Sequence, residues 1–136
     1  MPQDPGALPR AIIEAVFAAI DSGDIDGATR FFCDDITVHF ANVGPLIGST
    51  AFVGLYSQFS GVLQGVRHEI HDVWCVVENP NVLVAKMTAH YTRVDGEQVS
   101  LPCCNIFRMS GELISDYQVF MDMTPALSAP TAATTA

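Results

Sequence analysis

From Val66 onward the chain alternates apolar and polar residues over four long stretches, and this pattern limits its possible folds more than any other feature. The stretches are VRHEIHDVWCVVE, NVLVAKMTAHYTRV, QVSLPCCNIFRM and ELISDYQVFMD. Turn-forming residues connect them at Asn79-Pro80-Asn81, Asp95-Gly96 and Ser110-Gly111. Because a period of two is typical of strands, the sequence predicts four consecutive antiparallel strands.

The first half of the chain predicts helices with one strand between them. Apolar residues recur at helical spacing before the stop signal of Gly23, namely Ile13, Val16, Phe17 and Ile20. Asp24 can cap a shorter helix through IDGATRFFC, and DDITVHF alternates as a strand. We expect ANVGPLIG to form a loop, after which Ser49 or Thr50 caps a third helix that extends to about Leu63.

Helices followed by a run of antiparallel strands predict an α+β domain. We expect a cone-shaped α+β barrel, in which three N-terminal helices pack on a curved, mostly antiparallel sheet and a small ligand binds between the layers. Residues 10–125 are predicted to form this single domain. Residues 1–9 are predicted to be a flexible lead, and residues 126–136, which are small, polar and Pro-containing, a disordered tail.

Composition argues against several kinds of partner. The net charge is −9 with only 6 Lys and Arg residues, so the chain has no basic surface for phosphate groups, and we expect neither nucleic acid nor a membrane as a partner. The sequence shows no secretory signal and no apolar membrane span, which predicts a cytoplasmic protein. The four cysteines lack CxxC spacing and are predicted to be thiols, and we expect no cofactor and no metal.

Two parts of the sequence carry a family resemblance. The segments FFCDDITVHF…GPLIGSTAFVGLYSQF and YTRVDGEQVSLPCCNIFRMSGELISDYQVFMDMTP, with this order of elements, resemble the SnoaL-like branch of the nuclear-transport-factor-2-like superfamily over roughly Ala11 to Pro125. That superfamily includes ketosteroid isomerase, limonene-epoxide hydrolase, polyketide cyclases and many non-catalytic modules. The resemblance implies the cone fold and a homodimer formed through the outer face of the sheet.

The resemblance also shows which catalytic groups are missing. The oxyanion-hole tyrosine of the ketosteroid isomerases falls on Val16, and their general-base aspartate falls on Phe40. Their second oxyanion donor falls on Asn105 and a supporting tyrosine on Tyr56. Neither Val16 nor Phe40 can transfer a proton.

The other known mechanisms of the superfamily fit no better. The epoxide-hydrolase arginine falls on Lys86, and its two aspartates fall on Thr88 and Val119. The acid–base aspartate of the SnoaL cyclases also falls on Val119. The resemblance therefore implies either a different catalyst built on the same cone or a binding protein.

Strand alternation combined with these alignments predicts which side chains face the cone. His90 is the inward candidate for acid–base catalysis, and Asn105 and Tyr117 are candidates to stabilise negative charge on oxygen. The predicted substrate-binding residues are Val16, Phe40, Tyr56, Phe59, Leu63, Lys86, Thr88, Leu101, Cys103, Val119 and Met121.

Alternative interpretations remain for the candidate catalytic residues. A one-residue slip of the first strand would turn His39 inward in place of Phe40 and make His39 the base. His90 and Asn105 can equally be structural residues that satisfy their own hydrogen bonds in the sheet. His68 and His71 lie on opposite faces of a strand, so HEIH does not predict a metal pair, and neither was expected in the cone.

These observations lead to two functional hypotheses. The first is a cofactor-independent cyclase, isomerase or dehydratase that acts by acid–base chemistry on a hydrophobic polyketide-, terpenoid- or steroid-like small molecule. The second is a non-catalytic small-molecule-binding or dimerisation module of the same fold, which the absence of the relatives' carboxylates favours.

Overall fold

The computed structural model describes residues 7–128. Most of the predicted lead and tail, residues 1–6 and 129–136, therefore lies outside the described residues. Residues 7–9 belong to the first helix, and Ala126 and Leu127 belong to a short last helix, so both termini of the folded part extend further than the sequence analysis expected.

The first helix, α1 (Ala7–Asp21), packs one face against the sheet. The buried residues of this face are Ile12, Ile13, Val16, Phe17 and Ile20. The helix ends where Gly23 takes a positive φ of 84° and donates its N–H to the Ile20 carbonyl, a geometry that glycine adopts without strain. The predicted stop at Gly23 is confirmed.

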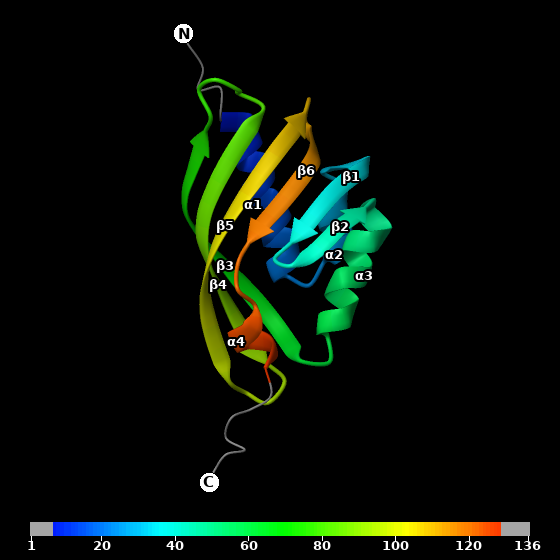
Figure 1. Cartoon of the computed structure of the whole chain (residues 1–136), viewed down its shortest axis with the longest axis vertical. Coiled ribbons are helices and arrows are strands. Elements are labelled where there is room, and N and C mark those ends of the chain that lie inside the picture. Colours follow the sequence, from blue (N-terminus) through cyan, green and yellow to red (C-terminus); the bar gives the residue numbers. More distant parts are fainter. Residues whose placement is uncertain (1–6, 129–136) are drawn as a thin grey trace.

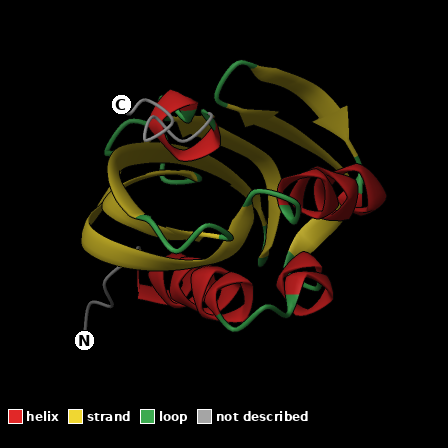
Figure 2. Cartoon of the chain, turned by 90° about the horizontal axis from the view of Figure 1, so that it is seen from below, coloured by secondary structure: helices red, strands yellow, loops and turns green. Residues whose placement is uncertain are grey.

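The second helix, α2 (Ile25–Thr29), begins as predicted. The Asp24 side chain accepts a hydrogen bond of 2.9 Å from the Gly27 N–H and so caps the helix. A Cβ atom at Gly27 would lie 2.1 Å from Asp24 Oδ2, so this cap requires glycine at that position. The tight turn brings α2 directly after α1 on the same side of the sheet (Figure 2).

Six strands form one curved sheet with the order β2-β1-β6-β5-β4-β3. Its strands are β1 (Phe32–Phe40), β2 (Val43–Ile47), β3 (Leu63–Cys75), β4 (Val82–Arg93), β5 (Gln98–Ser110) and β6 (Leu113–Phe120). β1 and β6 are parallel, and all other neighbours are antiparallel. The sheet curls strongly, and α1 lies across its concave face (Figures 1 and 2). The predicted α+β class and curved, mostly antiparallel sheet are confirmed.

The segment after β1 differs from prediction. The expected loop contains β2, whose residues Leu46 and Ile47 pair with Val38 and Thr37 of β1. An edge strand tolerates Gly44 and Pro45 because only one of its sides needs hydrogen bonds, and these residues hid the strand in the sequence.

The third helix, α3 (Ser49–Phe59), is shorter at its C-terminal end than predicted. Its N-cap residue is Gly48, with no side-chain cap, so the predicted capping role of Ser49 or Thr50 is wrong. Leu63 already belongs to β3, because it pairs with Arg93 of β4 and thereby extends the sheet. The turn after Phe59 thus separates helix from strand at the open end of the cone.

Aromatic rings fill the space between α1, α3 and the sheet. Phe107 and Tyr117 are register partners on β5 and β6, and their rings stack at 4.7 Å between centroids. Phe17 of α1 and Phe52 of α3 meet Tyr117 at 6.3 and 6.2 Å. This cluster fills the interior between the helices and the sheet with the protein's own side chains.

A short last helix, α4 (Thr124–Leu127), lies beside the far end of β4 (Figure 1). The buried guanidinium of Arg93 donates hydrogen bonds to the Ala126 carbonyl and to both carboxylate oxygens of Asp95, at 3.1 and 3.2 Å. The hydrogen bond from the Glu97 backbone N–H, and then the Arg93 guanidinium, hold the pKa of Asp95 below its usual range. None of the helices in residues 7–128 has the length and apolar character needed to cross a membrane.

We predict that Arg93→Met lowers the free energy of unfolding by about 1–3 kcal/mol, because it leaves the buried Ala126 carbonyl without a donor. Chemical denaturation measures this loss, and hydrogen exchange should show earlier exchange in α4. The matched control is Arg30→Met, which removes an exposed arginine at the end of α2 and should change stability little. Equal losses in the two variants would contradict the anchoring role of Arg93.

Candidate functional site

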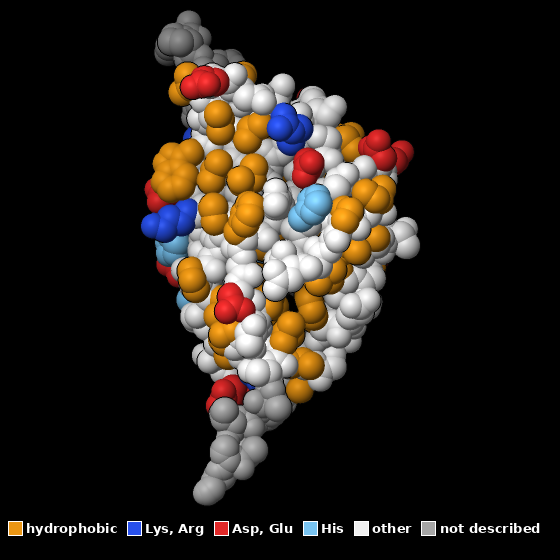
Figure 3. Space-filling view, in the orientation of Figure 1, with side chains coloured by type: hydrophobic (Ala, Val, Ile, Leu, Met, Phe, Trp, Pro, Cys, Tyr) orange, Lys and Arg blue, Asp and Glu red, His pale blue; other side chains and the backbone are white. Residues whose placement is uncertain are grey.

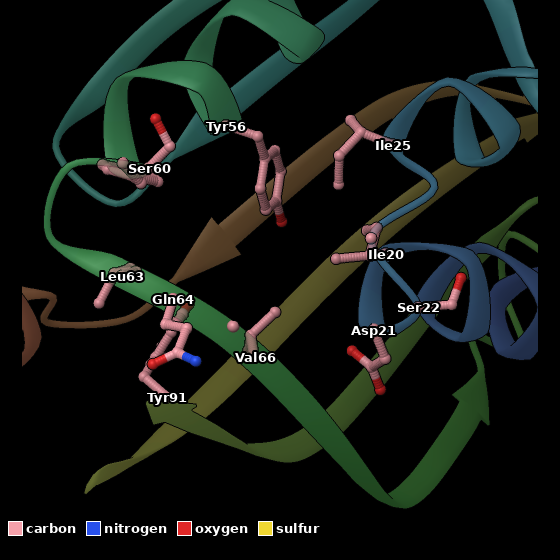
Figure 4. Close-up of a pocket in the computed structure, with 13 residues that line it drawn as sticks. Ile20, Asp21, Ser22, Ile25, Tyr56, Ser60, Leu63, Gln64, Val66 and Tyr91 are labelled. Carbon is pink, nitrogen blue, oxygen red and sulfur yellow. The ribbon is translucent and has the colours of Figure 1, made fainter. Parts of the chain in front are cut away.

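A cavity of about 400 Å³ opens beside the C-terminal end of α1. It lies between the α1–α2 turn, the C-terminal end of α3, the first residues of β3 and the end of β4 (Figure 4). Its apolar wall consists of Ile20, Ile25, Phe59, Leu63 and Val66. Asp21 is the one charged residue among those that line it. An apolar space with few polar groups suits a mostly hydrophobic ligand.

Asp21 is held in the cavity wall by two hydrogen bonds from His68. The His68 backbone N–H donates to Asp21 Oδ2 at 2.9 Å, and His68 Nδ1 lies 2.6 Å from Asp21 Oδ1. The side chain of His68 is 4% exposed and that of Asp21 is 22% exposed. Since a carboxylate can only accept, Nδ1 of His68 carries the hydrogen that is donated to Asp21.

The fold places His68 at this position by strand alternation. His68 lies between Val66 and Ile70 on the inner face of β3, opposite the buried Ala89, and its ring packs against Phe17 at 4.6 Å. Asp21 is the last residue of α1 and therefore meets the strand at the rim of the cavity. The pair thus joins residues 47 positions apart.

The sequence analysis missed this pair, since it did not expect His68 in the cone and did not consider Asp21. The sequence does indicate the orientation of His68. Val66, His68 and Ile70 alternate with polar residues, so the apolar neighbours place His68 on the buried face. No comparable signal links Asp21 to His68, because the contact depends on where α1 ends over the sheet.

Two tyrosines add hydroxyl groups to the cavity, Tyr56 from α3 and Tyr91 from β4. Figure 4 shows the Tyr56 side chain reaching from α3 into the space above Ile20 and Val66. Burial raises the pKa of both phenols far above the ordinary value, and nearby Cys103 and Asp21 add to the shift. Both tyrosines are therefore neutral near pH 7 and act as hydrogen-bond donors rather than bases.

Tyr117 and Asn105 face the interior, as the predicted alternation of β5 and β6 requires. Asn105 is 0% exposed; its Nδ2 donates to Cys103 Sγ at 3.3 Å, and its Oδ1 has no hydrogen-bond partner among the described residues. Burial raises the pKa of the Tyr117 phenol as well, with smaller contributions from Tyr56 and Cys103. Asn105 therefore offers an unpaired acceptor inside the cone.

Cys103 also faces inward, next to Asn105. Burial raises the pKa of its thiol to about 11, and the Asn105 hydrogen bond only partly opposes this shift. A thiol with a raised pKa is a poor nucleophile near pH 7. Cys103 therefore contributes shape and weak polarity to the interior.

The expected inward orientation of Lys86, Thr88 and His90 is wrong. Ala85 pairs with Asn105 and Met87 pairs with Cys103, and directly opposed residues share a face, so the intervening side chains of β4 point to the outer face. On that face His90 Nδ1 lies 2.7 Å from Ser100 Oγ and Nε2 lies 2.9 Å from Glu69 Oε1. The bond to His90 holds the pKa of Glu69 below its usual range.

The alternative base His39 also lies outside the cone. Phe40 is buried and His39 is only half-buried on the opposite face, so β1 keeps the register in which Phe40 points inward. Of the predicted substrate-binding residues, Tyr56, Phe59 and Leu63 line the cavity. The other inward-facing residues do not line it. Met121 is partly buried against the core, and the rest are buried in the core, namely Val16, Phe40, Leu101, Cys103 and Val119.

Metal binding finds no support in the arrangement of these groups. Across residues 7–128, no three His, Cys, Asp or Glu side chains come together in the manner of a metal site. Among the groups that line the cavity, the Asp21 carboxylate can accept a proton, and the neutral tyrosine hydroxyls can donate hydrogen bonds.

Comparisons with solved structures agree with the fold. An NTF2-like protein of unknown function from Burkholderia pseudomallei superposes with a TM-score of 0.80 at 14% identity, over 90% of this chain and 99% of that one. A protein from Xanthomonas campestris pv. campestris, provisionally assigned as a polyketide cyclase, gives 0.75 at 16% identity, over 90% and 96%. TerC, co-crystallised with polyporic acid, gives 0.76 at 17% identity, over 88% and 95%.

These structural neighbours share the fold at low sequence identity and do not transfer an activity. No curated protein sequence matches the chain significantly. The family model for the SnoaL-like domain, in contrast, matches residues 13–117, which cover most of α1, strands β1 to β5, the first half of β6 and the Asp21–His68 pair. The chain therefore belongs to the SnoaL-like domain family.

Proposed function

We propose that the protein is a cofactor-independent isomerase, cyclase or dehydratase that acts by acid–base chemistry on a hydrophobic small molecule. The observation that carries this proposal is the Asp21 carboxylate, oriented by His68 in the wall of a mostly apolar cavity. A carboxylate in apolar surroundings is a suitable base for removing a proton from carbon.

The proposed reaction begins with proton transfer to Asp21 from a carbon next to a carbonyl group of the substrate. The electron pair of the broken C–H bond then moves to the carbonyl oxygen. Tyr56 and Tyr91, which are neutral, donate hydrogen bonds to that developing enolate oxygen. Asp21 returns the proton to another atom of the substrate, which completes an isomerisation, ring closure or loss of water.

His68 has a positioning role in this scheme. Its backbone and Nδ1 donors fix both oxygens of Asp21, so the carboxylate keeps one orientation toward the cavity. Asn105 and Tyr117, which the sequence analysis proposed to stabilise negative charge on oxygen, are buried in the core and do not line this cavity, so the scheme gives them no step. The provisional polyketide cyclase and the ligand of TerC among the structural neighbours support a hydrophobic, oxygenated substrate class.

The second candidate function is ligand binding without chemistry. Its specific support is that Val16, Phe40 and Val119, which replace catalytic groups of the relatives, are all buried apolar residues. Such a protein would bind hydrophobic ligands in the same cavity but would not accelerate proton transfer.

We predict that the protein accelerates the ring opening of nitrobenzisoxazole, in which a base removes the ring C–H proton, the N–O bond breaks and a coloured phenolate forms. Asp21→Asn should reduce the rate by about a hundredfold because it removes the base. His68→Gln should cause a smaller loss, since it disturbs only the orientation of Asp21. Absorbance of the phenolate gives the rates.

The matched control for this experiment is Asp72→Asn, which removes an exposed carboxylate from β3 and should leave the rate unchanged. A loss in His90→Ala without a loss in Asp21→Asn would contradict the assignment of the base. If the wild-type protein binds the probe without accelerating the reaction, the binding function is the better account.

We also propose that the chain forms a homodimer through the outer face of the sheet. Trp74 and Phe120 are 50% and 49% exposed on this face, and the pairings Trp74↔Val84↔Ile106 connect apolar side chains across three strands. Figure 3 shows hydrophobic side chains gathered over the strands on the side away from α1. A sheet face of this composition is normally covered, and a second copy would cover it.

We predict that Trp74→Glu weakens the dimer by at least about thirtyfold, because it replaces the largest exposed apolar side chain of this face with a charge. Sedimentation at several protein concentrations measures the dissociation constant. Val77→Glu is the control, since Val77 is 94% exposed in the turn after β3 and outside this face. A wild-type protein that is monomeric at all concentrations would refute the proposed dimer.

A further inference from the structure

Phe59 stands between two separate cavities of the molecule. The first is the cavity at Asp21, of about 400 Å³. The second, of about 360 Å³, lies between the β1–β2 connection, from Ala41 to Val43 at the start of β2, and the residues Met123 and Leu127 around α4. Phe59 is the one described residue that lines both cavities.

The wall between the cavities consists of three aromatic rings. The ring of Phe59 lies 5.7 Å from that of Phe40 and 6.4 Å from that of Tyr56, and Phe40 and Tyr56 are 6.4 Å apart. Phe40 is buried on β1, whereas Phe59 is only partly buried at the last position of α3. Replacement of Phe59 therefore disturbs the core less than replacement of Phe40 would.

The second cavity can hold an apolar group. Val43 and Leu127 are large hydrophobic residues that remain 45% and 37% exposed at its rim, and Phe40 and Met123 form its floor. Asp122 is its one charged lining residue, and its carboxylate accepts a hydrogen bond of 3.0 Å from the Thr124 N–H. The roof is α4, which Arg93 holds through the Ala126 carbonyl.

We propose that Phe59 determines substrate specificity by setting the greatest length of an apolar tail that the cavity at Asp21 accepts. This inference rests on the proposed function, in that it takes the Asp21 cavity as the ligand site. A ligand with its polar end at Asp21 extends toward Phe59, and a longer tail meets the aromatic wall. The natural substrate then has one polar end and a compact apolar body rather than a long chain.

The proposal is tested with para-alkylphenols from ethyl to decyl, whose binding is measured by calorimetry. In the wild-type protein the affinity should rise by about fourfold for each added methylene group until the tail reaches Phe59, and then stop rising. In Phe59→Ala the rise should continue to longer tails, because the second cavity becomes available. In Phe59→Trp the rise should stop at a shorter tail than in the wild type.

The matched control is Phe31→Ala, which removes another partly buried phenylalanine that lines neither cavity and should keep the wild-type limit. The proposal is overturned if the wild-type affinity shows no limit, if Phe59→Ala stops at the wild-type length, or if no alkylphenol binds. If the limiting tail length changes in the Phe59 variants but the protein shows no proton-transfer activity, only the proposed function is refuted. If the protein shows proton-transfer activity but the limiting tail length is the same in the Phe59 variants, only the role of Phe59 is refuted.

Discussion

The contact between Asp21 and His68 is the constraint on which the site depends. It fixes the end of α1 against the inner face of β3 through two hydrogen bonds to one carboxylate. Because α1 ends there, the turn to α2 lies at the rim of the cone and the adjacent space stays open to form the cavity. Among residues 7–128, Asp21 is the only charged residue that lines the cavity, so structure and proposed chemistry rest on one pair of residues.

Strand alternation predicted much of this architecture. It indicates the buried face correctly when the pattern of each strand is used without the alignment to distant relatives. The burial of Leu101, Cys103 and Asn105 on β5 follows directly from their spacing. On β4 the set Leu83, Ala85, Met87, Ala89 and Tyr91 is apolar throughout and indicates the buried face correctly. The alignment with distant relatives instead predicted that Lys86, Thr88 and His90 face inward. This error placed His90 in the cone, whereas its side chain lies on the outer face of the sheet.

Other features could not be predicted because they depend on tertiary contacts. β2 has Gly44 and Pro45 in a strand of five residues, and only its pairing with β1 makes it a strand. α4 is four residues long, and the buried guanidinium of Arg93, more than thirty positions earlier, anchors it. The contact from Asp21 to His68 belongs to the same class, since neither sequence position indicates the other.

The most direct measurement of the central claim is a crystal structure of the protein with bound para-ethylphenol, which has one polar group and a short apolar tail. The account predicts density in the cavity between α1, α3 and β3, with the phenol oxygen within hydrogen-bond distance of Asp21 or Tyr56. Ligand found only beneath α4 or on the outer face of the sheet, with the Asp21 cavity closed by side chains, would contradict it.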